Sequence, residues 1–288
     1  MIISKTIGIK FAYLFKILFK GLNMQTGYYT ALGGMVTQFN RLNVISNNLA
    51  NVNTNGYKAD DIVIGDFEKM FKESRDNLPL ENNTKETSKF INRALNKVPQ
   101  IVEEYSDFSL GNIKRTGNDL DFALKKDNAF FLVKTPSGIK ATRDGSFEIN
   151  DEGHLVTKEG YEVLPKSYFK DYHLLEVRKN YPIKADANGD LYQNGLQTNS
   201  LYIASFDDLK KLKKIGDNLY DFGDMQPIEN GKNGVVQGFV EKSNVNAVKE
   251  MTNLIDTNRM VDMYQKVMDT QMNELNKDAI EKLANYRA

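Results

Sequence analysis

Cysteine and tryptophan are both absent from the 288 residues of this chain, which also contains only two histidines and six prolines. Without cysteine, the chain can form neither disulfide bonds nor thiolate metal sites. An excess of charge is missing as well, because 38 basic residues balance 38 acidic ones. This balance removes the general electrostatic argument for nucleic-acid binding, and no nucleic-acid partner is expected. The chain is nevertheless long enough to bury a substantial core in one or two domains.

A membrane-spanning run is not found at the N-terminus, although the first 22 residues, MIISKTIGIKFAYLFKILFKGL, are mostly apolar. Lys10 and Lys16 interrupt this run, which is too short and too charged to cross a bilayer. Its apolar and lysine faces are typical of a helix that lies on a membrane surface. A cleaved signal peptide fits poorly, because no small-x-small site follows the apolar part. A third interpretation is that translation starts at Met24, which would make residues 1–23 a doubtful extension.

The first regular pattern after Met24 is a row of large residues with helical spacing. Its members are Tyr28, Leu32, Met35, Phe39, Leu42 and Leu49. Spacing near 3.5 residues predicts the seam of a helix that packs against another helix. The row stops at NNLANVNTNGYK, where asparagine and glycine favour left-handed conformations and cap the last carbonyls. Residues 24–58 are therefore predicted to be a helix followed by a turn, in which the main residues are Asn47, Asn48, Asn51, Asn53, Gly56 and Tyr57.

The middle of the chain changes from a polar connection to a β pattern. Residues 59–104 are mixed and polar, and they predict an extended connection. From residue 105 onwards, short apolar runs alternate with turn dipeptides such as Asp-Gly and Asn-Gly, which predicts a β-rich domain over 105–238. Residues 239–288 return to heptad spacing and predict a second long helix. The predicted fold is a mainly β central domain flanked by long N- and C-terminal α-helices that pack together in an axial, helical assembly.

Each terminal helix needs a partner, because an isolated amphipathic helix is marginally stable in water. Pairing the two helices within one chain would leave much of both faces exposed. Neighbouring copies or related chains are expected to complete them, and such contacts between different patches build a helical array unless a ring closes. Ser243 or Asn244 is the expected N-cap of the closing helix. The expected assembly residues of this C-terminal part are Gly238, Ser243, Asn244, Val245, Met251, Leu254, Arg259, Val261, Met268 and Leu275.

Four stretches resemble the bacterial flagellar rod and hook family of axial proteins in the same order. They are SNNLANVNTNGYK, GNIKRTGNDLDFAL, TRDGSFEINDEGHLVTKEGYEVL and VVQGFVEKSNVNAVKEMTNLIDTNRMVDMYQKVM. The resemblance covers most of the chain from Met24 onwards. It implies a tubular assembly outside the cytoplasm, with export through the flagellar export apparatus and no cleaved signal peptide. It also implies partners among copies of the chain, neighbouring rod proteins and hook-side axial proteins, and it implies no cofactor, no catalysis and no small-molecule substrate.

The resemblance favours a rod subunit of the periplasmic basal body over a hook protein. Hook proteins of this family carry large inserted outer domains, and too few residues separate Gly111 from Gly238 for such an insert. A departure occurs at Asp127–Phe131, where the family usually has a glycine-flanked pair of phenylalanines. The family also usually begins near the first helix, which supports Met24 as the start. The proximal rod type is predicted, and the distal type is the alternative.

Two acidic pairs could suggest other functions. Asp119 and Asp121 would share one strand face, as paired acid–base carboxylates do. No activating group accompanies them, so a loop or strand-edge position is favoured over a hydrolase site. The segment Asp186–Asp190 resembles the start of a calcium loop, but Gln197 stands where the bidentate acid is needed, which favours a hairpin turn.

The two histidines, His154 and His173, lack the spacing of metal ligands, so no metal site is expected. A third kind of function, a secreted β-rich binding module with an oligomerising helical stalk, also stays open. Such a module would keep its ligand affinity after removal of the terminal helices, whereas a rod subunit would lose incorporation and motility.

Overall fold

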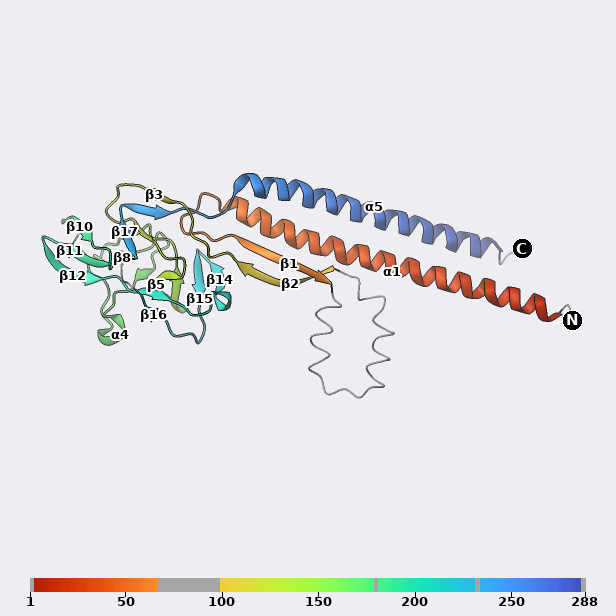
Figure 1. Cartoon of the computed structure of the whole chain (residues 1–288), viewed down its shortest axis with the longest axis horizontal. Helices are drawn as coiled ribbons and strands as arrows, with labels where there is room; N and C mark the ends of the chain where they lie inside the picture. Colours follow the sequence, from red (N-terminus) through yellow and green to blue (C-terminus); the bar gives the residue numbers. More distant parts are fainter. Residues whose placement is uncertain (1–2, 67–98, 179–180, 231–233, 286–288) are drawn as a thin grey trace. The chain divides into compact units, whose positions relative to one another are not determined.

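The computed structural model describes residues 3–66, 99–178, 181–230 and 234–285 of the chain. The chain forms two compact units. The first comprises Met1–Ser46, Asp61–Glu104 and Met251–Ala288, and the second comprises Asn47–Asp60 and Tyr105–Glu250. Figure 1 shows the elements of both units, coloured along the sequence. Both units are therefore built from segments that lie far apart in the sequence.

The first unit contains most of two long helices and of one strand pair. Helix α1 spans Ile3–Ala50, and helix α5 spans Ala247–Asn285. Strands β1 (Asp60–Asp66) and β2 (Pro99–Ser106) form a two-stranded sheet. These strands occupy the two ends of the predicted extended connection, residues 59–104, whose middle lies outside the described residues. Within the part of the chain that the structure describes, no helix is long and apolar enough to cross a membrane.

Helix α1 includes residues 3–23 together with the pattern that begins after Met24. The surface-helix, signal-peptide and alternative-start interpretations of this N-terminal segment stay predictions. The helix ends at Ala50, inside the asparagine-rich stretch. Residues 47–51 of that stretch form a last helical turn, in which the backbone amide of Asn51 donates to the carbonyl oxygen of Asn47 at 3.1 Å.

Helices α1 and α5 pack closely in antiparallel directions. Gly34 of α1 lies against the ring of Tyr264, and a β-carbon on this glycine would be 2.5 Å from Cε1 of the tyrosine. Seven residues earlier in α1, a β-carbon on Gly27 would lie 3.3 Å from Oε1 of Gln271, which is seven residues later in α5. Glycine thus occurs where the two helices approach each other, since a side chain would separate them.

The face of α1 that carries Gly34 is one position away from the row predicted as the helix seam. Its buried residues are Ala31, Gly34, Gln38 and Ile45. The large residues of the predicted row remain accessible, and Leu32 and Phe39 are 39% and 44% exposed. The contact within the chain thus uses a row that includes the small residues Ala31 and Gly34, which allow close helix packing. The role of the accessible row in assembly with other chains stays a prediction.

The second unit is β-rich, and its largest sheet has nine strands. Seven of them follow the order β14-β15-β6-β5-β9-β8-β7, while β13 pairs with β5 and with β16. The bounds are β5 Ala129–Thr135, β6 Gly138–Thr142, β7 Glu148–Ile149, β8 Leu155–Val156, β9 Glu162–Val163, β13 Ile203–Ser205, β14 Lys213–Gly216, β15 Leu219–Asp221 and β16 Ile228–Glu229. The pairs in this sheet are antiparallel.

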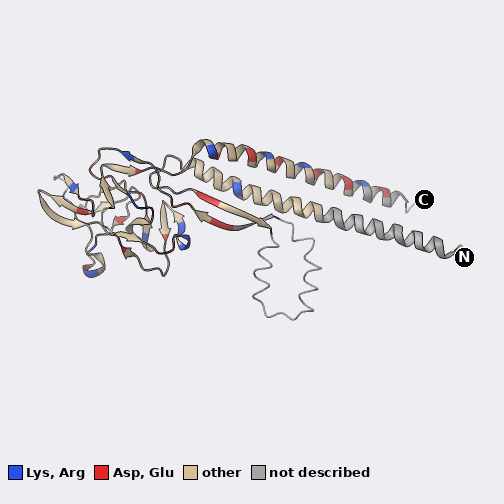
Figure 2. Cartoon of the chain, in the orientation of Figure 1, with Lys and Arg blue, Asp and Glu red and all other residues tan. Residues whose placement is uncertain are grey.

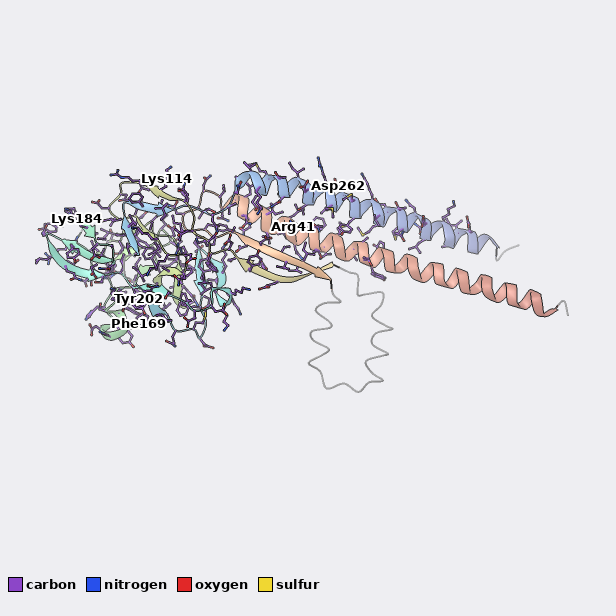
Figure 3. The ribbon with its side chains drawn as sticks, in the orientation of Figure 1. Arg41, Lys114, Phe169, Lys184, Tyr202 and Asp262 are labelled. Atoms are coloured by element: carbon purple, nitrogen blue, oxygen red, sulfur yellow. The ribbon has the colours of Figure 1, made fainter. Side chains whose placement is uncertain are left out.

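Smaller sheets and two short helices complete the second unit. The strand groups are β10-β11-β12, β17-β4 and β18-β3. Their bounds are β3 Ile113–Arg115, β4 Phe122–Leu124, β10 Ile183–Ala185, β11 Asp190–Gln193, β12 Leu196–Ser200, β17 Val235–Gln237 and β18 Phe239–Glu241. The short helices are α4 Tyr168–Asp171 and the 3₁₀ helix η2 Leu209–Lys211. Near α4, the ring of Phe169 lies 5.0 Å from that of Tyr202 (Figure 3).

Strand β5 lies at the centre of the β-rich unit and is buried on both faces. Phe131 and Val133 point into one core cluster, which also contains Phe147. Phe130 and Leu132 point into a second cluster on the opposite face, as the two-residue period of a strand requires. The segment Asp127–Phe131, where the chain departs from the glycine-flanked family pattern, thus leads directly into this central strand.

Candidate functional site

The outer surface of the helix pair is the first candidate site, because it exposes large apolar side chains. On α1, Tyr29 and Val36 are exposed in addition to Leu32 and Phe39. Between residues 27 and 50, α1 contains a single charged residue, Arg41 (Figures 2 and 3). Exposed apolar side chains with so little charge among them are a feature of surfaces that bind another protein or a membrane. The remaining predicted residues of α1, Tyr28, Met35, Leu42 and Leu49, are half-buried.

Helix α5 differs from α1, because acidic and basic residues alternate with its apolar residues (Figure 2). Of the predicted residues, Val261 is buried, and Leu254, Met268 and Leu275 are half-buried. Met251 and Arg259 are exposed instead. Further exposed apolar residues of α5 are Ile255, Met260, Met263, Val267, Met272 and Ile280. Like α1, this helix has an inner face and an unpaired outer apolar surface in the single chain.

A buried ion cluster in the second unit forms the other candidate site. It consists of Lys58, Arg143 and Glu241, whose side chains are at most 2% exposed. Nζ of Lys58 donates to Oε1 of Glu241 at 2.6 Å. Nε and Nη2 of Arg143 both donate to Oε2 of Glu241, at 2.9 and 2.5 Å, and these bonds are charge-assisted.

The polar atoms of this cluster have further partners, as burial of charge requires. Nζ of Lys58 also donates to the carbonyl oxygen of Ser109 at 2.6 Å, and the amide of Gly111 donates to Oε1 of Glu241 at 2.9 Å. Nη1 of Arg143 donates to the carbonyl oxygens of Lys126 and Ala129. Both carboxylate oxygens of Glu241 thus accept hydrogen bonds. The cluster of Lys58, Arg143 and Glu241 is called the joint below, because it has a structural role and each of its charged groups already has a partner.

Burial shapes the electrostatics of this joint. Desolvation, followed by the nearby Arg143, lowers the pKa of Lys58 below its usual value, and Glu241 opposes this shift. Lys214 has a lowered pKa for the same first reason, and its contact with Asp60 opposes the shift. Glu241 is one negative charge between two positive ones. The cluster therefore depends on this carboxylate more than on either cation.

Lys214 holds the end of the asparagine-rich stretch from the sheet side. Its Nζ donates to the carbonyl oxygen of Lys58 at 2.9 Å and to Oδ2 of Asp60 at 2.8 Å. It also lies 3.6 Å from the centroid of the Tyr57 ring, in cation–π contact. Burial and the neighbouring Asp60 raise the pKa of Tyr57, which keeps its hydroxyl protonated as a hydrogen-bond donor. The chain after Gly56 is therefore fixed by side chains from two directions.

The predicted turn residues bind within the second unit rather than standing free. Asn48 is buried: its Nδ2 donates to the carbonyl oxygen of Asp60, and its Oδ1 accepts from the amide of Asp60. Asn51 donates back to Asn47, and Asn53 is exposed. Asn47, which accepts that bond, is exposed too. The turn is thus locked by the chain that follows it.

Two further contacts tie this turn to distant strands. Nδ2 of Asn55 donates to Oγ of Ser146 at 2.7 Å, and Oδ1 of Asn55 accepts from Nζ of Lys242 at 2.7 Å. Gly56 has a φ of +69°, and its Cα packs directly on the backbone of Arg143 and Asp144. Only glycine combines this left-handed conformation with so close an approach.

The prediction that Ser243 or Asn244 is the N-cap of the closing helix is wrong. Asn246, which precedes α5, accepts from the amide of Lys249 at 3.1 Å and is the N-cap. Ser243 accepts only from the amide of Val245, before the helix begins. Asn244 accepts from the amide of Ala59 at 2.8 Å and donates to the carbonyl oxygen of Asp107 at 2.8 Å. These two hydrogen bonds occupy the side chain of Asn244, which therefore cannot cap the helix.

Gly238 and the two candidate aspartates belong to the same side of the unit. Gly238 has a φ of +78°, and its amide donates to the carbonyl oxygen of Asp121 at 2.8 Å. The carbonyl oxygen of Asp119 accepts from Nε2 of Gln237 at 2.6 Å. The Asp121 side chain is buried and accepts from Nδ2 of Asn118 at 3.3 Å. Both aspartates thus occupy a loop and strand-edge position, next to the glycine turn.

Three family models match separate parts of the chain. The model described as flagella basal body rod protein matches residues 29–58. The flagellar hook protein FlgE/F/G D1 domain matches residues 126–197, and the C-terminal model of flagellar basal body rod FlgEFG proteins matches residues 236–280. The three matches lie at the start, centre and end of the chain, in the order of the motifs found in the sequence.

Curated relatives match almost the whole chain. The flagellar basal-body rod protein FlgF of Rhizobium meliloti (strain 1021) is 35% identical over 92% of this chain and 100% of its own length. The chain belongs to the flagellar basal-body rod protein family. FlgF of Mesorhizobium japonicum is 32% identical over 82% of this chain and 89% of its own length. FlgG of Buchnera aphidicola subsp. Schizaphis graminum is 31% identical over 85% of this chain and 95% of its own length.

The two candidate sites can now be related to the family to which the chain belongs. A flagellar basal-body rod protein is a structural protein located in the basal body, and it assembles with other rod and axial proteins. Each of the three matched segments contributes one member of the ion cluster: Lys58, Arg143 and Glu241. Sequence reasoning missed this cluster. Local sequence gives no clear signal for it, because Glu241 is followed directly by Lys242, and Lys58 lies between NGY and Asp60 in a polar stretch.

Proposed function

We propose that this chain is a structural subunit of the flagellar basal-body rod that assembles through the outer surfaces of α1 and α5. The observation that carries the proposal is the exposure of Leu32 and Phe39 on a helix with a single charge between residues 27 and 50. Burying such side chains against a neighbour is favourable, at roughly 25 cal/mol per Å² of apolar surface. Copies of the chain and neighbouring rod proteins would supply the covering surface.

Within this proposal, the rod crosses the periplasm and transmits torque from the motor to the hook. Hook-side axial proteins and the flagellar export apparatus are its further proposed partners, and export without a cleaved signal peptide is part of the proposal. The buried contacts within the second unit support this role: Lys58, at the end of the asparagine-rich stretch, pairs with Glu241 of β18, and Asn244 accepts from the amide of Ala59.

Assembly through α1 is tested by placing a charge on its exposed surface. Phe39→Glu should abolish incorporation into purified basal bodies and swimming in a strain without its own copy of the gene. The purified variant should keep the circular dichroism and thermal unfolding of the wild type, because an exposed substitution changes stability by only about 0.5 kcal/mol. Phe39→Leu keeps the surface apolar and should incorporate normally. Normal incorporation of both Phe39→Glu and Leu32→Glu would refute the proposal.

We further propose the proximal rod type for this chain. The match to the whole length of Rhizobium meliloti FlgF, at 35% identity, supports it. The distal rod type is the alternative, since the FlgG of Buchnera aphidicola matches at 31% identity. Complementation separates the two types: the chain should restore motility to a Rhizobium meliloti strain that lacks FlgF, and it should fail in one that lacks FlgG. The reverse pattern would assign the distal type.

A further inference from the structure

The turns between β7, β8 and β9 bring a histidine together with two carboxylates. Glu152 lies in the turn after β7, His154 directly precedes β8, and Glu162 lies on β9. One ligand atom from each of the three side chains lies within 4.8 Å of the others. Nδ1 of His154 is 3.6 Å from Oε2 of Glu152 and 3.6 Å from Oε1 of Glu162. Three metal-ligating groups therefore converge at one point of the second unit.

Hydrogen bonding does not explain this arrangement. A nitrogen–oxygen hydrogen bond is about 2.7–3.2 Å long, so both separations are too great. Nδ1 of His154 is buried and has no hydrogen-bond partner among the residues that the structure describes. Two atoms that each lie about 2.0–2.1 Å from a tetrahedral zinc ion are roughly 3.4 Å apart. The two separations from His154 are close to that edge length, and the three ligand atoms all lie within 4.8 Å of one another.

The backbone holds two of the three groups in place. The amide of His154 donates to Oδ1 of Asn150 at 2.8 Å, and the amide of Asn150 donates to the carbonyl oxygen of His154 at 3.0 Å. Glu162 is fixed by strand pairing with Lys134 and Val156. Nζ of Lys134 lies 3.4 Å from Oε2 of Glu162, the oxygen that does not face His154. Preorganisation of this kind lowers the cost of binding a metal.

We propose that Glu152, His154 and Glu162 bind one Zn²⁺ ion. Imidazole nitrogen and carboxylate oxygen are ligands that zinc accepts in tetrahedral sites, and water would fill the fourth position beside the exposed Glu152. The ion would link the β7–β8 turn to β9 and stabilise the β-rich unit, since zinc binding to a folded site adds to folding free energy. This site goes beyond the proposed rod function and differs from the expectation, drawn from sequence spacing, that no metal is bound.

The test is zinc titration of the full-length chain, produced without a histidine tag and treated with a chelator. Calorimetry should show one equivalent of Zn²⁺ bound, and a hundredfold excess over the dissociation constant should raise the Tm by on the order of 5 °C. His154→Ala should abolish both effects. His173→Ala is the matched control, because His173 is the second of the two histidines and is exposed. It should bind zinc as the wild type does.

A second variant guards against misfolding of His154→Ala. Glu152→Gln changes a side chain that is 75% exposed, so it should fold normally and bind zinc more weakly. Equal zinc binding by the wild type, His154→Ala and Glu152→Gln would overturn the proposal. It would also be overturned if zinc left the wild-type Tm unchanged while His154→Ala lowered it without metal. That result would assign His154 to an ion pair with the two carboxylates.

Discussion

Lys58 and Glu241 lie 183 residues apart in the sequence, yet Nζ of the lysine is 2.6 Å from Oε1 of the glutamate inside the protein. Arg143 binds the other oxygen of the same carboxylate. One acidic side chain thus compensates two buried basic ones, and it also accepts from the amide of Gly111. The second unit therefore relies on a single carboxylate to join the end of the asparagine-rich stretch, the central sheet and strand β18.

Glu241→Gln should destabilise the second unit by about 3–5 kcal/mol, because it leaves two buried cations without a counter-charge. Urea unfolding of the purified chain measures this loss. Glu229→Gln is the control: it breaks an ion pair of 3.3 Å with Lys166 at the surface and should cost less than about 1 kcal/mol. Similar losses of unfolding free energy for the two variants would show that the buried carboxylate stabilises the chain no more than a surface carboxylate does.

Gly56→Ala should cost about 3 kcal/mol or more, since it combines a left-handed conformation with a steric clash. The new β-carbon would meet the backbone of Arg143 and Asp144. Gly117→Ala separates the two causes, because Gly117 has a φ of +79° but nothing within 4 Å of its β-carbon position. This control should lose only about 1–2 kcal/mol in the same unfolding measurement. Equal losses of unfolding free energy in the two variants would mean that the close packing at Gly56 contributes nothing to the destabilisation.

Asp144→Asn should stabilise the folded chain at neutral pH. Burial raises the pKa of Asp144 above its usual value of 3.8, against opposing hydrogen bonds from Ser146. The folded state then holds the proton more tightly than the unfolded state, so wild-type stability falls as pH rises from 3.8 through the folded pKa. The variant removes the charge and retains an oxygen for the amide of Ser146, which donates to Oδ1 of Asp144 at 2.9 Å.

The pH dependence of that gain identifies its cause. Thermal unfolding of both proteins should show a gain above the folded pKa that disappears below pH 3.8, where the wild-type carboxyl is protonated in both states. A gain that stayed constant across this pH range would show that the buried charge is not responsible.

The sequence predicted the long terminal helices, but it did not predict which row of α1 contacts α5 within the chain. Leu32 and Phe39 stand out in a sequence because they are large and apolar. The row that carries Gly34 faces Tyr264 because it is small. Large apolar side chains therefore predict which surface of a helix can be buried, whereas small side chains determine where two helices approach closely.

The joint was beyond sequence reasoning for a different reason. Asn48, Gly56 and Asn244 were recognised as turn or capping residues, a property that depends on nearby residues only. The partners of Gly56 and Asn244 come from distant parts of the chain, as in the contact between Asn244 and the amide of Ala59, 185 residues apart. Periodicity reports local conformation and says nothing about pairing at this distance. Long-range ion pairs such as that of Lys58 and Glu241 need the fold itself to be known.

Because Glu241 lies late in the sequence, it also becomes available later than Lys58 and Arg143. Any process that delivers the chain from its N-terminus onwards, such as synthesis, presents Lys58 and Arg143 long before the carboxylate that neutralises them. Until residue 241 arrives, both cations stay hydrated, because burying them unpaired is too costly. Closing around the asparagine-rich stretch before residue 241 is present would leave Lys58 and Arg143 buried without their carboxylate. The position of Glu241 in the sequence thus disfavours closure of the second unit before most of the chain is present.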